Sequence, residues 1–177
     1  DLDPTPWLEK PLRVTMFTNN YLPFIGGVPI SIERLRRGLE HLGDSTQIVA
    51  PRYRDQPSHE DAVVRVPSLL AMGEKREFRL ANIFLARIRK QVRAFRPDVI
   101  HLHHPFWLGS LGLFMARQLR IPAIYTYHTR LEHYAHFVPL PGMLFRNLIS
   151  HALIKRFANR CDGVIVPTYS TEEYLRM

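Results

Sequence analysis

The sequence predicts an α/β protein built on a doubly wound parallel sheet with helices on both faces. Short apolar segments alternate along the chain with longer segments of 3.6-residue periodicity, at the spacing of strand–helix–strand units. Some short segments, such as Val164-Ile165-Val166, are apolar at consecutive positions, as in strands that are covered on both sides. Because such connections are right-handed, these features together favour a Rossmann-like arrangement.

The first unit follows a proline-rich leader, expected over residues 1–12. A strand is predicted over 14–17, a loop over 18–27, and a helix that begins at Val28 or Pro29, since proline is tolerated in the first turn of a helix. Gly43 ends this helix. Its predicted buried face is apolar at near-helical spacing and consists of Ile32, Leu35, Leu39 and Leu42.

The remaining elements extend a single domain over residues 13–177. Strands are predicted over 46–50, 62–66, 99–103, 123–127 and 163–166, and helices over 79–95, 110–119 and 143–159, with a last helix opening at Ser170. The helix over 143–159 carries two adjacent apolar rows, one through Leu148 and one through Leu153. A stripe of this width is expected to cover the sheet.

The composition is typical of a globular protein, with 46% hydrophobic and 23% charged residues. No apolar run approaches the roughly 20 residues that a membrane-spanning helix needs. The first residues lack the basic and apolar regions of a secretory signal, and Cys161 is the single cysteine. We therefore expect a cytoplasmic protein. Its net charge of +8 favours phosphate-bearing partners.

A basic segment spans the crossover and the helix before the fourth strand. Two interpretations stay open: a solvated helix exterior, or a surface that rests on anionic lipid headgroups. Nucleic acid is not expected as a partner, because the sequence has no RRM, KH, zinc-finger or helix-turn-helix pattern. The residues assigned to the membrane surface are Lys75, Arg76, Arg79, Arg89, Lys90 and Arg93.

The carboxyl ends of the parallel strands are expected to bring three segments together, at the edge where such sheets bind ligands. These segments are the loop 18–27, His103-His104 and His128. In the loop, Gly26 and Gly27 precede a helix, and the free N–H groups and helix dipole there suit a phosphate. A plain tight turn is the alternative, since the loop has neither GxGxxG nor a Walker-type motif.

The histidines invite comparison with metal sites and with hydrolases. No HExxH motif or cysteine-bearing spacing accompanies the histidines between 101 and 136, so we expect no metal site. The sequence has no GxSxG motif either, which disfavours serine hydrolase chemistry. Strand alternation predicts that His101 and His103 lie on one face of the sheet.

Several runs of residues resemble a known family. The first is Phe17-Thr18-Asn19-Asn20-Tyr21-Leu22-Pro23 followed by Gly26-Gly27-Val28, and the second is Tyr127-His128-Thr129 with Glu132, Tyr134, His136 and Pro139. With Asp98-Val99-Ile100-His101 and Asp162-Gly163-Val164-Ile165-Val166-Pro167, they closely resemble the N-terminal half of family 4 retaining glycosyltransferases of the GT-B fold. The second run is most similar to the branch that glycosylates diacylglycerol and related lipids.

The resemblance implies a two-domain enzyme that moves a sugar from a UDP- or GDP-linked nucleotide diphosphate sugar to an acceptor such as a membrane lipid, with retention. It implies no required metal or other cofactor. This chain supplies the acceptor side, and its partner is its own C-terminal nucleotide-sugar domain, which is absent from these residues. Alone, the chain is expected to be inactive. A peripheral contact with the inner face of the membrane is a further expectation.

The resemblance also assigns roles to residues. Gly26 and Gly27 offer N–H groups to the donor diphosphate, and His128 is the catalytic residue beside the transferred sugar. An aspartate is common in the family where Asn19 stands, and an aromatic is frequent at Leu131, so the acceptor stays open. The residues expected to bind the acceptor are Asn19, Tyr21, His103, Thr129, Glu132, Tyr134 and His136.

Two other functions remain open at this stage. One is a non-catalytic nucleotide- or lipid-binding module. The other is half of an inverting GT-B transferase or epimerase, which a carboxylate or histidine placed as general base at the glycine loop would favour.

Overall fold

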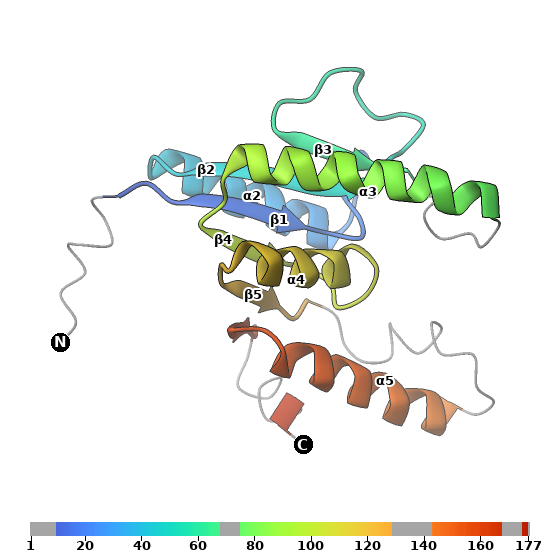
Figure 1. Cartoon of the computed structure of the whole chain (residues 1–177). Coiled ribbons are helices and arrows are strands. Elements are labelled where there is room, and N and C mark those ends of the chain that lie inside the picture. Colours follow the sequence, from blue (N-terminus) through green and yellow to red (C-terminus); the bar gives the residue numbers. More distant parts are fainter. Residues whose placement is uncertain (1–9, 68–74, 129–142, 168–174, 177) are drawn as a thin grey trace, which may run out of the picture.

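The structure, a computed structural model, describes residues 10–67, 75–128, 143–167 and 175–176 (Figure 1), with the backbone alone for 75–82 and 143–147. The predicted strands and helices inside these ranges are confirmed, and their ends differ by a few residues at most; Ser170 lies outside them. The elements are β1 (Arg13–Phe17), α2 (Gly27–His41), β2 (Ser45–Pro51), β3 (Val63–Val66), α3 (Lys75–Phe95), β4 (Val99–Leu102), α4 (Leu108–Leu119), β5 (Ala123–Thr126), α5 (Met143–Asn159) and β6 (Gly163–Ile165).

The six strands of the sheet are parallel and lie in the order β3-β2-β1-β4-β5-β6. The chain moves outward from β1 to β3, and α3 then returns it to the other side of β1, where β4 starts the second half. The register pairs Met16 with His101 and Phe17 with Leu102. The strand order therefore reverses between β1 and β4, which is the position where doubly wound sheets bind ligands.

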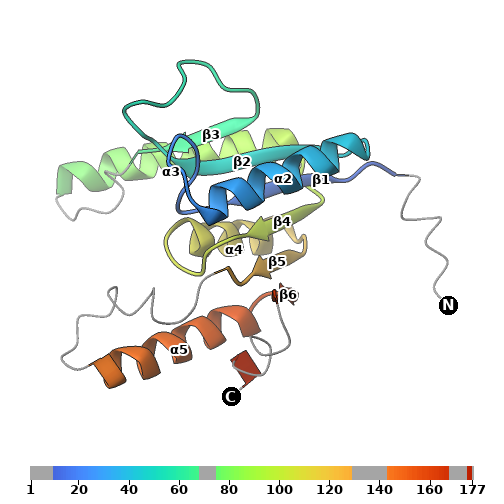
Figure 2. The ribbon, with the colours of Figure 1, turned by 180° about the vertical axis from the view of Figure 1, so that it is seen from behind.

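Helices cover both faces of the sheet, as the sequence predicts (Figures 1 and 2). On one face α3, α4 and α5 contribute Val92, Leu113 and Phe157 to the larger core cluster. On the other face Ile32 of α2 packs with Met16 of β1. The connection from β1 to β2 moves across the sheet toward β3, whereas the crossovers through α3, α4 and α5 move across it toward β6. Right-handed connections therefore place α2 on its own face.

Helix α4 lies very close to the sheet at Gly112. A Cβ atom at this position would come within 2.4 Å of the Leu102 Cδ2 methyl and 2.8 Å of the Phe17 ring. Glycine is required here by the close approach of the helix to β1 and β4. This contact fixes the beginning of α4 beside the carboxyl ends of both strands.

The buried face of α2 differs from the predicted one. Ile32 is fully buried and Leu39 is partly buried, but Leu35 is 36% exposed and Leu42 is 74% exposed. The prediction was wrong at these two leucines. Arg36 instead occupies the inward position between Ile32 and Leu39, because its guanidinium reaches the loop that precedes the helix.

The predicted face of α5 is confirmed only in part. Phe157, in the predicted row through Leu153, is buried, but Leu148 and Leu153 are 59% and 42% exposed, and the buried Ile154 lies in neither predicted row. The Phe157 ring meets Tyr125 of β5 edge to face, with the ring centroids 5.2 Å apart. This aromatic contact turns α5 so that the row through Ile154 faces the sheet.

Strand β6 is less covered than its sequence suggests. It pairs with β5 at the end of the strand order, and Val164 and Ile165 are 39% and 50% exposed in the described structure. A consecutive apolar run was expected to be covered on both faces, and this expectation was wrong at the edge strand. Within the described ranges, none of the helices has the length and continuous apolar character that crossing a bilayer requires.

Candidate functional site

The carboxyl ends of β1 and β4 are joined by Asn19. Its backbone N–H donates to His104 Nδ1 at 3.0 Å, and its side-chain Nδ2 donates to the Phe106 carbonyl at 2.8 Å. Its Oδ1 accepts from the N–H of Leu108, the first residue of α4, at 3.1 Å. The residue before α4, Trp107, has a φ of 52° and makes no side-chain cap. Asn19 therefore caps α4 from another segment, because the local sequence offers no capping oxygen.

Three histidines form a column on the α2 face of the sheet. His101 and His103 are two residues apart at β4, and their ring centroids are 4.1 Å apart, so the predicted shared face is confirmed. His103 Nδ1 lies 2.8 Å from Nε2 of His128, which follows β5. His101 Nε2 lies 2.6 Å from Thr126 Oγ1. Hydrogen bonds thus connect the ends of β4 and β5 on one side of the sheet.

Burial keeps these imidazoles neutral. Desolvation lowers the pKa of His101 to about 4, with a smaller contribution from nearby His128. The same cause lowers the pKa of His104 to about 4 and takes that of His103 well below its ordinary value. The pKa of His128 is also lowered by burial, although this side chain is only half-buried. At neutral pH each ring can therefore donate one hydrogen bond and accept another.

Helix α2 begins at the glycine pair without a side-chain cap. Gly26 is the N-cap residue in an extended conformation, and Gly27 is the first helical residue. A Cβ atom at Gly27 would meet nothing within 4 Å, whereas one at Gly26 would lie 3.0 Å from the Phe24 ring. The first N–H groups of the helix therefore have no side-chain cap, and the Cβ side of Gly27 is open.

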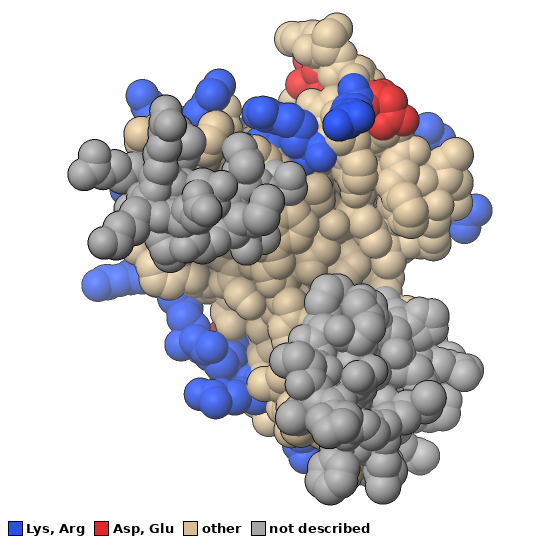
Figure 3. Space-filling model, turned by 90° about the vertical axis from the view of Figure 1, so that its right-hand side faces the viewer, with Lys and Arg blue, Asp and Glu red and all other residues tan. Residues whose placement is uncertain are grey.

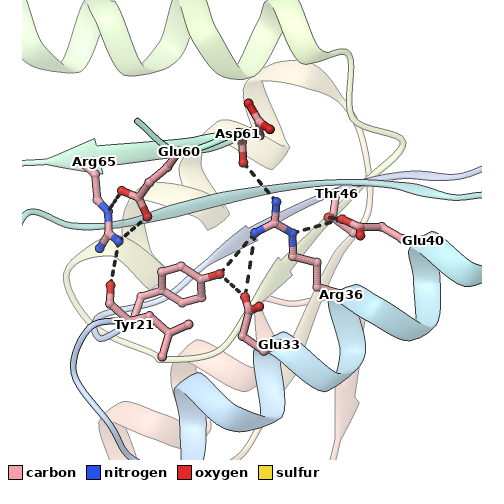
Figure 4. A network of polar contacts seen from close by, with 9 residues as sticks. Tyr21, Glu33, Arg36, Glu40, Thr46, Glu60, Asp61 and Arg65 are labelled. Carbon is pink, nitrogen blue, oxygen red and sulfur yellow. Dashed lines mark hydrogen bonds and ion pairs between the residues drawn. The ribbon is translucent and has the colours of Figure 1, made fainter. Parts of the chain in front are cut away.

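The loop between β1 and α2 is held in place by Tyr21. The Tyr21 side chain is 2% exposed, and its hydroxyl donates to Glu33 of α2 while Arg36 donates to it at 3.3 Å (Figure 4). Burial and the neighbouring Glu33 raise the pKa of Tyr21 to about 12, so the hydroxyl stays protonated. The same loop is held from the other side by Arg65, which donates to the Leu22 carbonyl at 2.6 Å.

Figure 3 shows the edge of the sheet toward which the β1 arrow points in Figure 1. The middle of this view carries uncharged residues, and Lys and Arg gather at several places around it. Among the residues that the structure describes, no group of three His, Cys, Asp or Glu side chains is arranged to hold a metal ion. The middle of this edge is therefore uncharged where it is described, and His101, His103 and His104 at the strand ends are buried.

The model of Glycosyltransferase Family 4 matches residues 25–177. This chain belongs to that family. Its relatives include the alpha-monoglucosyldiacylglycerol synthase of Streptococcus pneumoniae, 34% identical over 165 residues that make up 93% of this chain and 37% of the relative. The GDP-mannose-dependent alpha-mannosyltransferase of Corynebacterium glutamicum is 30% identical over 182 residues, 94% of this chain and 40% of the relative. The chain thus spans about two fifths of the length of these relatives.

Solved structures show the same fold. UGT73P12 of Glycyrrhiza uralensis, complexed with glycyrrhetinic acid 3-O-monoglucuronide, matches with a TM-score of 0.54 and 13% identity over 94% of this chain and 47% of its own. The UDP-GlcNAc 2-epimerase of Methanocaldococcus jannaschii matches with a TM-score of 0.53 and 16% identity over 94% of this chain and 42% of its own. The family 4 chain therefore has the Rossmann-like fold of an N-terminal GT-B domain.

The structure describes some of the site residues that the sequence predicts and leaves others outside the described ranges. His103 and His128 meet, as their places at neighbouring strand ends predict. Tyr21 is buried and bonds Glu33 and Arg36, and the Asn19 side chain bonds the Phe106 carbonyl and the Leu108 N–H. Acceptor binding by either residue stays a prediction. Thr129, Glu132, Tyr134 and His136 lie outside the described residues.

The sequence analysis did not identify the residues that hold the loop between β1 and α2. Arg65 lies on edge strand β3 and Arg36 on α2, and no motif links either one to Tyr21. The only available signal was charge on otherwise apolar elements, since an Arg inside a strand or on a buried helical row needs a partner. Of the residues assigned to the membrane surface, Arg89, Lys90 and Arg93 belong to a helix on the opposite face from α2, and the side chains of Lys75, Arg76 and Arg79 are not described.

Proposed function

We propose that this chain is the N-terminal, acceptor-side domain of a retaining glycosyltransferase that moves a hexose from a nucleotide diphosphate sugar to a membrane lipid. The observation that carries this proposal is the 34% identity to an alpha-monoglucosyldiacylglycerol synthase over 93% of the chain. Because the chain spans about two fifths of that relative, its partner is its own C-terminal domain, which would bind most of the nucleotide sugar. The donor carries UDP or GDP.

The proposed donor contact is the glycine pair. The N–H groups at Gly26 and Gly27 begin α2 without a side-chain cap, and open space adjoins Gly27. Such N–H groups, with the positive end of the helix dipole, stabilise the negative charge that develops on a departing diphosphate. In a retaining transfer the departing phosphate can itself accept the proton of the acceptor hydroxyl. This proposal therefore needs no strongly basic side chain, which agrees with the lowered pKa of His128.

His128 is the proposed catalytic residue, and His103 positions it. His128 is half-buried at the end of β5, where a neutral imidazole can bond a hydroxyl of the transferred sugar. His103 is 1% exposed, and its Nδ1 lies 2.8 Å from Nε2 of His128. This contact fixes the orientation of the His128 ring and leaves Nδ1 of His128 for the substrate. This is a change from the acceptor-binding role expected for His103, because its own ring has no exposed surface.

Contact with a membrane is proposed for helix α3. Lys90 and Arg93 are exposed, on the side opposite to buried Ile88 and Val92, and Ile83 is 65% exposed. Cations beside an exposed apolar side chain suit an anionic bilayer surface, and each cation near it contributes about 1 kcal/mol. A solvated helix exterior is the competing interpretation, and it predicts no binding to vesicles.

The test uses the full-length protein that contains this chain. UDP- and GDP-linked glucose and mannose are offered with diacylglycerol and with monoglucosyldiacylglycerol, and the product is analysed for its anomeric configuration. The proposal expects transfer from one donor with retention, and no transfer by residues 1–177 alone. Inversion, epimerisation of the donor, or binding without turnover in the full-length protein would each refute it.

A separate measurement tests the membrane contact. The protein is sedimented with anionic and with zwitterionic vesicles at increasing salt. We expect binding to the anionic vesicles that weakens with salt, and a loss of binding when Lys90 and Arg93 are both replaced by Gln. Equal sedimentation of the variant and the parent would refute a role for this helix.

A further inference from the structure

A pocket lies between the loop that joins β2 to β3, edge strand β3 and helix α3. Its volume is about 270 Å³, and its polar lining includes Arg52, Ser58, Arg87 and Gln91. Neither His103 nor His128 contributes to it, and the glycine pair does not either. The pocket is therefore distinct from the proposed transfer site, although Arg65 and Glu60 in its wall also hold the loop before α2.

The charges in this pocket do not balance. Glu60 is the one carboxylate among its described lining residues, and it already pairs with Arg65 at 2.7 Å, with both side chains largely buried. Arg52 and Arg87 are exposed at the pocket, and in the described ranges no carboxylate lies within ion-pair distance of either one. The pocket thus contains two guanidinium groups whose charge no described protein group offsets.

This lining matches the chemistry of a phosphate group. A guanidinium presents its N–H donors in a planar fork that fits phosphate oxygens, and Gln91 and Ser58 add neutral donors. The volume lies just below the lower end, about 300 Å³, of typical ligand pockets, so a phosphate with a few attached atoms fits better than a nucleotide. The apolar part of the wall, against which a short carbon chain can pack, includes Phe84 and Ile88 of α3 and Val63 and Val64 of β3.

We propose that this pocket binds a small phosphate ester of the size of glycerol phosphate, held between Arg52 and Arg87. The ligand is either a soluble metabolite or the headgroup of an anionic phospholipid, since both present the same chemistry. The site requires no transferase activity, so its test is independent of the proposed function. Figure 3 shows Lys and Arg side chains beside Asp and Glu side chains at the upper part of this edge, near the β2–β3 loop.

Isothermal titration calorimetry with glycerol 3-phosphate at low ionic strength tests the site. The protein is compared with Arg52→Gln, Arg87→Gln and Arg37→Gln, of which the last removes the same charge from an exposed position on α2, across the sheet from α3. We expect saturable binding that each pocket variant weakens about tenfold or more and the control leaves unchanged. Thermal unfolding verifies that all variants fold, as expected for exposed side chains that form no ion pair with the described residues.

Sedimentation with phosphatidylglycerol vesicles separates the two sources. If the ligand is a lipid headgroup, the pocket variants lose sedimentation and glycerol 3-phosphate displaces the parent protein. If the ligand is soluble, all four proteins sediment equally while calorimetry still distinguishes them. An absence of saturable glycerol 3-phosphate binding, or equal weakening by Arg37→Gln, overturns the proposal, because binding would then reflect net charge alone.

Discussion

Replacement of Arg65 by methionine tests how the loop before α2 is held. The Arg65 guanidinium donates to Glu60 at 2.7 and 2.8 Å, to the Pro51 carbonyl at 2.9 Å and to the Leu22 carbonyl at 2.6 Å. Its side chain is 6% exposed and that of Glu60 is 16% exposed. Methionine keeps the aliphatic volume but removes the charge and all of these donors. The carboxylate of Glu60 and two backbone carbonyls then lose their partners.

The expected loss is set by the uncompensated charge. Breaking a buried ion pair by removing one partner costs about 3–5 kcal/mol. For a chain of this length each kcal/mol lowers the melting temperature by about 2–4 °C, so the midpoint should fall by about 6–20 °C. If Glu60 is replaced by methionine as well, no buried charge is left alone, and part of the loss should be recovered as a coupling energy of about 0.5–3 kcal/mol.

Urea and thermal unfolding of the parent, both single variants and the double variant give this coupling energy directly. Arg37→Met, at an exposed position of α2, is the matched control and should change stability by less than about 0.5 kcal/mol. Additive single effects would refute the reasoning, since they would mean that Arg65 and Glu60 act independently. A midpoint shift for Arg65→Met no larger than that of the control would do the same.

Three further predictions concern packing, pH and catalysis. Gly112→Ala should lower the free energy of unfolding by about 1–3 kcal/mol, because the new Cβ would lie within 2.4 Å of a leucine methyl. Gly38→Ala should raise the free energy of unfolding by about 0.4–1 kcal/mol, because Gly38 is exposed on α2 and its Cβ would meet nothing within 4 Å. Melting-temperature shifts of equal sign for the two variants would contradict this prediction. Burial lowers the pKa of His101 and His104 from 6.5 to about 4, so the unfolded chain binds their protons first as the pH falls. The contribution of these two residues to the free energy of unfolding is therefore fully present above pH 6.5 and decreases toward pH 4, by up to about 1.4 kcal/mol per pH unit for each residue. A free energy of unfolding in urea that does not change between pH 6.5 and pH 4 would refute this prediction. In the full-length transferase, His128→Ala should lower kcat on the order of a hundredfold with an unchanged melting temperature, and an unchanged kcat would remove His128 from the site.

The order of elements was predictable because it depends on local patterns. Strand and helix positions follow from periodicity and from glycine and proline boundaries, and the six strands lie where these patterns predict them. The meeting of His103 and His128 was predictable as well, because both stand at the carboxyl ends of strands in one parallel sheet. These inferences need only the strand direction and the alternation of side chains.

The roles of individual side chains were less predictable. Asn19 and Tyr21 have the same types as binding residues, but Asn19 caps α4 and Tyr21 is buried against Glu33. The sequence gives no sign of the partner in either case, because α4 begins far along the chain from Asn19 and Glu33 belongs to a helix whose rotation is set by its packing. The outward turn of Leu148 on α5 has the same origin.

By itself, the sequence determined the fold class, the positions of the strands and helices, and the family, because each depends on short patterns that survive in any context. Only the tertiary structure decided which side of each helix is buried, which polar side chains hold the loop before α2, and that Arg52 and Arg87 line one pocket. The physical reason is that burial and charge pairing depend on residues far apart in the chain, whose contacts are fixed only once the sheet and its helices have packed.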